Sequence, residues 1–278
     1  MKRIYVINSR REREPFSFTK VYNSCRRAGA SDSLAQEIAL SIKKQIYPDI
    51  PTSKIFKLVK QKLAARSPSS SIKISLKEAI RRLGPDGFDF EKYVAQVFSR
   101  EGFKVKINQE IPGRCINSYE IDFLAKKKNL IYVGECKYHH LAGGRVVLRE
   151  ALSNYARFLD IANSSRFKNQ NVKTILITNT KFTSEVVKYS KCTKMELLGW
   201  NYPRRKGLEE TIERLNLYPV TILPAFKNYF KSIFAKKRMM LALDILETPL
   251  PTLSKRLNIP KRDIQQLIAE AKILLQRS

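Results

Sequence analysis

The sequence predicts an α/β chain of mixed α+β type in three parts: a helical N-terminal domain, a central sheet domain and a helical basic tail. Apolar residues recur at helical spacing through the first part, and amphipathic helices alternate with β-prone segments in the second. A serine- and proline-rich run, Arg66-Ser-Pro-Ser-Ser-Ser71, is typical of a linker. We therefore expect domains over residues 1–66, 75–223 and 224–278, with a linker at 67–74.

In the central domain the expected order is helix, three strands, helix, strand, helix, strand. Residues 88–100 have the apolar spacing of an amphipathic helix, which Gly102 ends. The segments that alternate or run apolar like strands are 103–107, 120–125, 130–136, 172–177 and 195–198. This alternation of elements predicts a mixed sheet with helices on both faces.

The charge balance is far from neutral, with 53 Lys and Arg against 25 Asp and Glu, a formal net charge of +28. Nucleic acid is the usual partner of such a surplus, and a membrane surface is the other candidate. No run of about 18 uncharged apolar residues is present, and no secretory signal is recognisable. The four cysteines are scattered without a C-x-x-C pair, which favours reduced thiols and a cytoplasmic protein.

Acidic and basic residues cluster on two strands that are joined by a short turn. Glu135 and Lys137 are two residues apart on one strand and so share a face, and Asp122 lies on the preceding strand. Two carboxylates on adjacent strands form an oxygen-rich site for a hard divalent cation such as Mg²⁺ or Mn²⁺. The backbone carbonyl of Cys136 is a further candidate ligand, and Glu91 on the preceding helix can complete the site or hold a second metal.

An exposed strand with surface salt bridges is the alternative explanation of the same residues, since Glu-x-Lys triplets are common. Glu135 and Lys137, however, end the apolar run Leu130-Ile-Tyr-Val133, which places them near the core. Charges there are costly unless they are paired or bound to metal. A metal bound at this position can orient a phosphate and activate water, and Lys137 can stabilise the developing charge.

Residues 84–223 resemble the Mrr-like restriction endonucleases, a branch of the PD-(D/E)xK nucleases. The matching segments are Gly87-Phe-Asp-Phe-Glu91, Gly102-Phe-Lys-Val105, Tyr119-Glu-Ile-Asp122, Gly134-Glu-Cys-Lys-Tyr138, Thr178-Asn-Thr-Lys-Phe-Thr183, Leu198-Gly-Trp200 and Leu217-Tyr-Pro219. The resemblance implies a catalytic set of Glu91, Asp122, Glu135 and Lys137. Two departures are visible: Ile121 replaces the proline before Asp122, and Tyr119 stands where relatives often carry histidine.

Residues 4–64 resemble an ATP-cone, the nucleotide-sensing module of ribonucleotide reductases. The matching residues are Val6, Glu14-Pro-Phe16, Lys20, Arg27-Ala-Gly-Ala-Ser31 and Thr52-Ser-Lys-Ile55. The family usually has Lys-Arg-Asp-Gly after its first strand, whereas this chain has Asn8-Ser-Arg-Arg11. The resemblance implies an ATP or dATP effector bound near Val6, Arg10, Arg11, Glu14 and Lys20. A domain retained for oligomer contacts or DNA binding is the alternative.

Basic residues outside these two sites are candidates for DNA contact. Gly143-Gly-Arg145 is predicted to open a long helix, where Arg145 suits a phosphate, although a flexible turn is an equal alternative. His139 and His140 can touch phosphate or lie in a solvated loop. The tract 224–243 lacks acidic residues, and its cations are Lys227, Lys231, Lys236, Lys237 and Arg238. The last residues are typical of a helix-turn-helix-like pair.

We expect from these observations a Mg²⁺-dependent endodeoxyribonuclease that acts in restriction, in defence against foreign DNA, or in DNA repair. The expected partners are DNA, an adenine nucleotide and further copies of the chain in a dimer or larger oligomer, but no membrane. A non-catalytic, nucleotide-responsive DNA-binding regulator is one rival interpretation. It is weakened because the chain lacks the zinc-ligand cysteines of a ribonucleotide-reductase repressor. A junction nuclease is the other rival.

Overall fold

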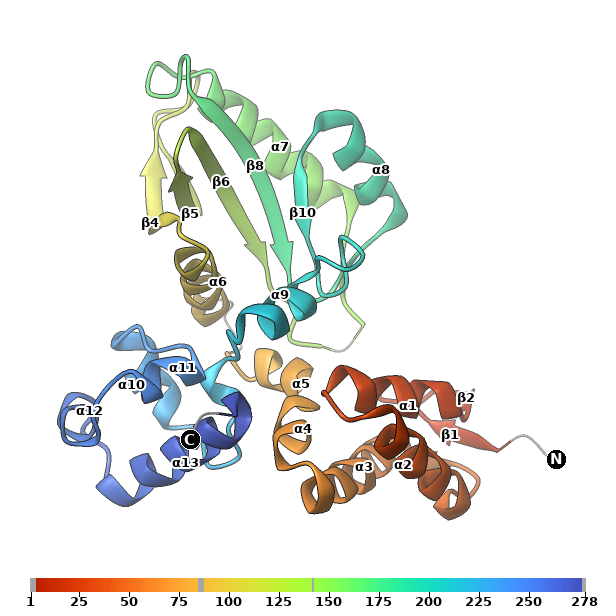
Figure 1. Ribbon diagram of the computed structural model, residues 1–278. Coiled ribbons are helices and arrows are strands. Elements are labelled where there is room, and N and C mark those ends of the chain that lie inside the picture. Colours follow the sequence, from red (N-terminus) through yellow and green to blue (C-terminus); the bar gives the residue numbers. More distant parts are fainter. Residues whose placement is uncertain (1–3, 85–87, 142, 277–278) are drawn as a thin grey trace. The chain divides into compact units, whose positions relative to one another are not determined.

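The computed structural model describes residues 4–84, 88–141 and 143–276 (Figure 1). The chain forms two compact units. The helical unit comprises residues 1–79, 222–227 and 245–278, and the sheet unit comprises residues 80–221 and 228–244. No helix in the described part of the chain is long and apolar enough to cross a bilayer. The four cysteines are free, two buried and two exposed.

The N-terminal part of the helical unit combines a small sheet with a helical core. Strands β1 (Tyr5–Ile7), β2 (Arg13–Pro15) and β3 (Ile50–Pro51) pair in the order β2-β1-β3. The helices are α1 (Phe18–Arg27), α2 (Asp32–Gln45) and α3 (Thr52–Arg66). Ser17 and Ser31 each accept a backbone N–H in the first turn of the helix that follows, which satisfies a donor the helix leaves open. Buried Ile and Val side chains of these helices pack against β1.

Residues 67–74, where the sequence predicts a linker, instead contain helix α4 (Pro68–Lys73) with buried serines. Pro68 occupies the first turn, where a missing N–H costs nothing. Ser71 Oγ donates to the carbonyl of Lys60 at 3.0 Å, and Ser69 Oγ donates to the carbonyl of Leu274 at 3.2 Å. The serines are therefore buried because their hydroxyls have backbone partners on other helices.

The predicted tail, residues 224–278, is divided between the two units. Helices α12 (Leu250–Leu257) and α13 (Lys261–Leu275) belong to the helical unit, where α13 packs against α4. Helix α10 (Phe230–Lys236) belongs to the sheet unit, and α11 (Ala242–Leu246) follows it. Asp244 explains the division, because its buried carboxylate accepts from Arg100 and from the backbone N–H of Leu241. Of the aromatic residues interleaved with the basic residues of this tract, Phe226, Phe230 and Phe234 are buried, whereas Tyr229 is exposed.

The sheet unit is built on five strands in the order β10-β8-β6-β5-β4. They are β4 (Lys104–Ile111), β5 (Tyr119–Lys127), β6 (Leu130–Lys137), β8 (Asn171–Thr178) and β10 (Glu196–Leu198). The first three are antiparallel, and β6, β8 and β10 are parallel. A separate two-stranded pair joins β7 (Arg145–Val146) to β9 (Lys181–Phe182).

Helices cover both faces of this sheet, which confirms the predicted fold class. Helix α6 (Phe88–Arg100) packs on the face of Phe123 and Tyr132 through Phe98. Helix α7 (Leu148–Ala162) packs on the other face, where Ile161 lies in a cluster with Val133 and other apolar residues. The chain also contains helices α5 (Leu76–Arg81), α8 (Ser184–Thr193) and α9 (Leu208–Leu215) and a 3₁₀ turn at Val220–Ile222. Successive side chains of a strand point to opposite faces of the sheet, so the residue pattern along the strands reflects both covered faces.

Gly134 leaves the space that the ring of Phe123 occupies across the β5–β6 ladder. A Cβ atom at this position would lie 2.1 Å from Phe123 Cζ, and Phe123 is fully buried. We predict that Gly134→Ala lowers the free energy of unfolding by about 1–3 kcal/mol, since the ring must move in a packed core. Urea denaturation measures the change. Adding Phe123→Leu should recover part of the loss, and a Gly134→Ala chain as stable as wild type would contradict this account.

Candidate active site

Asp122 lies where the pairing of β5 with β6 ends and where its pairing with β4 is interrupted. The β5–β6 ladder closes with Phe123 opposite Gly134, and the β4–β5 ladder omits the pairing of Asp122 with Asn108. Asn108 has a φ of 49°, a left-handed conformation that asparagine tolerates. Asp122 Oδ2 accepts the backbone N–H of Cys136 at 2.6 Å. The side chain thus replaces a ladder hydrogen bond and holds the carboxylate beside the end of β6.

Glu135 is buried, with 6% of its surface exposed, and two cations contact it. Lys137 Nζ lies 2.6 Å from Glu135 Oε1, and Arg157 of α7 contacts Oε2. Arg157 also donates to the carbonyl of Glu120 at 3.2 Å, which ties it to β5. A carboxylate buried this deeply needs such partners, because an unpaired charge in the core is costly.

Arg157 is a site residue that the sequence reasoning missed. A helical projection of residues 148–162 could have found it. On this projection Ala151, Asn154 and Ile161 form the buried face of α7, and Arg157 lies beside that face. Asn154 is itself buried and donates to Thr174 Oγ1 at 3.1 Å. A polar residue and an arginine at the edge of a core-facing helix stripe indicate a buried anion on the sheet below.

Burial, with the charges of neighbouring carboxylates, raises the pKa values of Glu91 and Asp122. Burial raises the pKa of Glu91 to about 7, with the charges of Asp122 and Glu135 adding to the effect. Burial and the charge of Glu135 raise the pKa of Asp122 to about 6, against the opposing hydrogen bond from Cys136. Burial lowers the pKa of Lys137, but the hydrogen bond to Glu135 and the negative charges of Glu135 and Asp122 together outweigh burial. The net pKa is raised, so the ammonium stays charged at neutral pH. Lys137 and Arg157 therefore leave the negative charge of Glu91 and Asp122 incompletely balanced.

The oxygen ligands of this site suit a hard cation that keeps some of its bound water molecules. Among the described residues, no group of three or more His, Cys, Asp or Glu side chains is close enough to hold a metal by itself. Mg²⁺ is commonly bound through one or two carboxylates, with water and substrate phosphate as the other ligands. Asp122 and Glu135 match that pattern, and the two raised pKa values identify a place where added positive charge is favourable.

The other predicted site residues are distributed differently from expectation. Arg145 does not open the long helix: it lies in β7, and α7 begins at Leu148 with Glu150 accepting the N–H of Val147. The sequence misplaced it because a two-residue strand has no recognisable periodicity. The ring of His139 is not in a solvated loop, since its Nε2 is buried and its backbone exchanges two hydrogen bonds with Asn179. Gly87, the first residue of its motif, lies outside the described residues.

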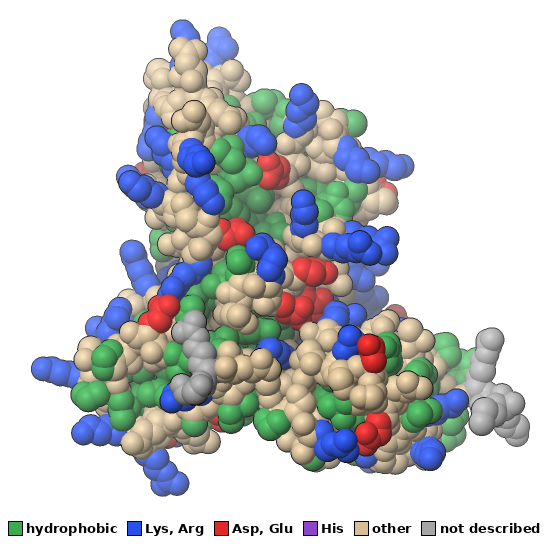
Figure 2. Space-filling model, viewed as in Figure 1, with side chains coloured by type: hydrophobic (Ala, Val, Ile, Leu, Met, Phe, Trp, Pro, Cys, Tyr) green, Lys and Arg blue, Asp and Glu red, His purple; other side chains and the backbone are tan. Residues whose placement is uncertain are grey.

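The predicted basic face of the tail is also divided. Lys227 belongs to the helical unit and pairs with Asp263 at 2.9 Å, whereas Lys231 belongs to the sheet unit. Burial and the charge of Arg82 lower the pKa of Lys231. Three exposed cations lie at the end of α10 and just after it, namely Lys236, Lys237 and Arg238. Figure 2 shows Lys and Arg side chains spread over the visible surface of each unit.

The five predicted nucleotide-site residues lie on one hairpin and the start of α1. Val6 is buried in β1 opposite Glu14, and Glu14 pairs with Lys20 of α1 at 3.1 Å. Arg10 and Arg11 are exposed in the turn between β1 and β2. Arg11 has a φ of 64°, so it adopts in this turn a backbone conformation that favours glycine.

Three family models match the chain: the ATP cone domain over residues 4–100, the restriction endonuclease model over 83–200, and the model "AF1548-like, C-terminal" over 218–275. An uncharacterised protein from Archaeoglobus fulgidus is 32% identical over 179 residues, which are 64% of this chain and 98% of that protein. The crystal structure of the protein of unknown function AF1548 is 30% identical, with a TM-score of 0.59. It covers 68% of this chain, and the match takes in 98% of its own length. The chain belongs to the AF1548-like family.

This AF1548-like protein therefore joins an ATP-cone domain to an Mrr-type restriction endonuclease domain, as the resemblance in the sequence predicts. The restriction endonuclease match includes Glu91, Asp122, Glu135 and Lys137 within its bounds. The match to the restriction endonuclease model indicates that the sheet unit is a nuclease of the restriction endonuclease fold, and the match to the ATP cone model indicates nucleotide regulation. The roles of the individual residues remain predictions.

The raised pKa of Glu91 predicts how stability depends on pH without metal. The folded chain binds this proton more tightly than the unfolded chain, so the contribution to stability is complete below pH 4.5 and is lost as pH rises through about 7. Glu91→Gln removes the titration. In EDTA the variant should be more stable than wild type at pH 8, on the order of 1 kcal/mol after solvent screening, with the difference closing towards pH 5.

Thermal unfolding at the two pH values measures this difference. Glu110→Gln, which removes an exposed carboxylate from β4, is the matched control and should show no such pH-dependent gain. If Glu91→Gln destabilises the chain equally at both pH values, the carboxylates do not repel one another in the way their positions imply.

Proposed function

We propose that this AF1548-like protein is a divalent-metal-dependent endonuclease that hydrolyses phosphodiester bonds in DNA. The observation that supports it most strongly is the convergence of Asp122, Glu135 and Lys137 where β6 ends beside β5, with Glu91 within electrostatic reach. The restriction endonuclease model matches the same strands, which supports a nuclease role for these residues. Restriction, defence against foreign DNA and DNA repair are the settings that this chemistry suits.

Asp122 and Glu135, with the backbone carbonyl of Cys136, would hold Mg²⁺ or Mn²⁺. The ion would supply polarisation of the scissile phosphate and a lowered pKa for a bound water. Lys137 is charged and can donate to the attacking water or to a phosphate oxygen, where it stabilises the negative charge that develops. Arg157 holds Glu135 in one orientation and is a positioning residue in this proposal.

Cleavage should depend on the site residues, and DNA binding should not. We predict that Glu135→Ala, Asp122→Ala and Lys137→Ala each lower the cleavage rate by about 100-fold or more, because metal or charge stabilisation is lost. Glu91→Ala should be milder. Metal-free DNA binding should persist in Glu135→Ala and Asp122→Ala, which remove negative charge near phosphate.

A nicking assay beside a gel shift on the same preparations measures both quantities, with circular dichroism to confirm folding. Lys173→Ala is the matched control for Lys137→Ala. It also removes a strand lysine paired with a glutamate, here Glu196 at 3.0 Å, but on an exposed part of the sheet. Folded Glu135→Ala protein that cuts at the wild-type rate would place the active site elsewhere. A wild-type chain that binds DNA and never cuts it would favour the alternative function, a non-catalytic, nucleotide-responsive DNA-binding regulator.

We also propose that the β1–β2 hairpin of the ATP-cone domain binds ATP or dATP. The bound nucleotide would change the assembly state of the protein and take no part in the cleavage chemistry. The match to the ATP cone domain and the cations of the β1–β2 turn support this proposal. We predict that calorimetry detects binding, that Arg10→Ala with Arg11→Ala weakens it by about 10-fold or more through lost phosphate contacts, and that light scattering detects the changed assembly.

Arg66→Ala is the control for the cone, because it removes an exposed arginine that pairs with Glu37 on helices away from the hairpin. It should leave nucleotide affinity unchanged. No heat of binding at millimolar nucleotide would contradict the effector proposal and leave the nuclease proposal intact.

A further inference from the structure

Helices α12 and α13 form a compact helix-turn-helix whose turn is fixed by its own residues. Three residues, Asn258-Ile-Pro260, join the helices, and Asn258 adopts a φ of 52° that ends α12. Ser254 Oγ donates to the carbonyl of Ile259 at 2.8 Å and locks the turn. The helices are held together by buried apolar residues, namely Leu253, Leu257, Ile259, Ile264 and Leu267. A turn of this length between two short helices is the arrangement found in DNA-binding helix-turn-helix units.

The exposed face of α13 carries groups that suit nucleic acid. Lys261, Arg262, Gln265 and Gln266 are exposed in its first two turns, at the i, i+3 and i+4 spacing of one face. Arginine can bond guanine and glutamine can bond adenine through two hydrogen bonds at the major-groove edge. The face thus combines positive charge with side chains able to distinguish bases.

Both acidic residues of α13 are used inside the helical unit. Asp263 pairs with Lys227 at 2.9 Å, and Glu270 accepts the backbone N–H of Ala225 at 2.8 Å. The acidic side of the helix therefore contacts the 222–227 segment. The exposed side is left with lysine, arginine and amide groups, which complement a polyanion.

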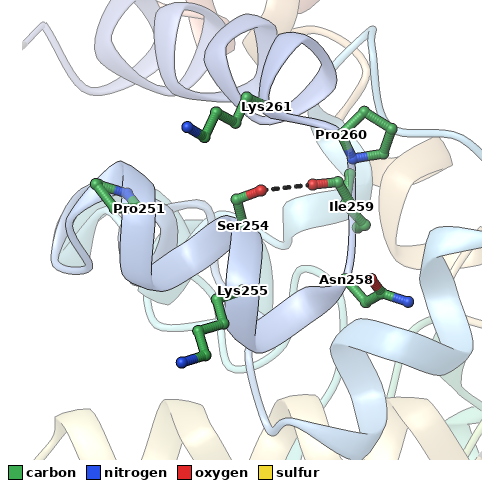
Figure 3. A pocket seen from close by; sticks show the side chains of 7 residues that line it. All are labelled: Pro251, Ser254, Lys255, Asn258, Ile259, Pro260 and Lys261. Atoms are coloured by element: carbon green, nitrogen blue, oxygen red, sulfur yellow. Dashed lines mark hydrogen bonds between the residues drawn. The ribbon is translucent and has the colours of Figure 1, made fainter.

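A surface hollow of about 590 Å³ lies between α12 and the start of α13. Its lining includes Lys255 of α12 and Lys261 of α13, with Ser254 between them (Figure 3). In this view the side chains of Lys255 and Lys261 both extend to the left, from α12 and from the start of α13. A ridge of phosphates that follows the edge of a groove can be contacted by both ammonium groups at once.

We propose that α13 enters the major groove of duplex DNA and reads base edges with Arg262, Gln265 and Gln266, while Lys255 and Lys261 contact phosphates. The major groove, about 12 Å wide, admits an α-helix with its side chains. The inference rests on the proposed action on DNA and extends it, because it makes the substrate a duplex with a preferred sequence. The preference is carried by the helical unit, and the carboxylates lie in the sheet unit.

The test is selection from a random duplex library by the full chain in EDTA, so that no cleavage occurs. Wild type should enrich a short motif. Discrimination between that motif and a scrambled duplex should fall about 10- to 100-fold in Arg262→Ala, Gln265→Ala or Gln266→Ala, each at its own base pairs. Lys255→Ala should weaken binding to both duplexes alike and reduce the slope of log affinity against log salt by about 1.

Lys272→Ala is the matched control for Arg262→Ala. It removes one exposed positive charge from the same helix, but ten residues or roughly 15 Å further along, away from the end that would meet base edges. It should keep the motif. Absence of any enriched motif, or discrimination that survives all three substitutions, would overturn the inference, as would binding of an acidic protein but no duplex. A chain that selects a motif without cutting would instead overturn the nuclease proposal alone.

Discussion

The hydrogen bond from the Cys136 N–H to the Asp122 carboxylate is the interaction on which the candidate site depends. It forms where the β5–β6 ladder ends, so a side chain takes the place of a backbone acceptor. That substitution brings a second carboxylate close to Glu135 inside a partly buried region, at an electrostatic cost that the raised pKa of Asp122 records. The fold maintains this repulsion because the ladder, and not the carboxylates, determines where the strands lie.

The two helices that sandwich the sheet complete the site from opposite sides. Helix α7 contributes Arg157, which neutralises Glu135 from one face. Helix α6 contributes Glu91, and its Phe98 ring packs against Phe123 on the other face. Because the same packed aromatic residues define the core and orient α6, the electrostatics of the site and the stability of the sheet unit are set by one arrangement of side chains.

Local patterns in the sequence predicted what depends on local geometry. Strand alternation and the Glu-x-Lys spacing located Glu135 and Lys137 on one face of the sheet. Contacts between distant segments were not predictable in this way. The sequence predicted a linker at the serines of α4, because the carbonyls that accept their hydrogen bonds, those of Lys60 and Leu274, come close only in the folded chain. The division of the tail likewise depends on Asp244 meeting Arg100, 144 residues away.

The chemistry of the candidate site also limits what it can recognise. Its carboxylates, Lys137 and Arg157 suit metal, water and phosphate, which are the same at every nucleotide. Additional lysines elsewhere would strengthen binding to all sequences equally, and with 53 cations against 25 acids the chain has many of them. Direct readout of a sequence therefore needs side chains that can form two hydrogen bonds with a base edge. Within the described residues of the helix-turn-helix, such side chains stand together at the start of α13, where both nearby acids are engaged elsewhere.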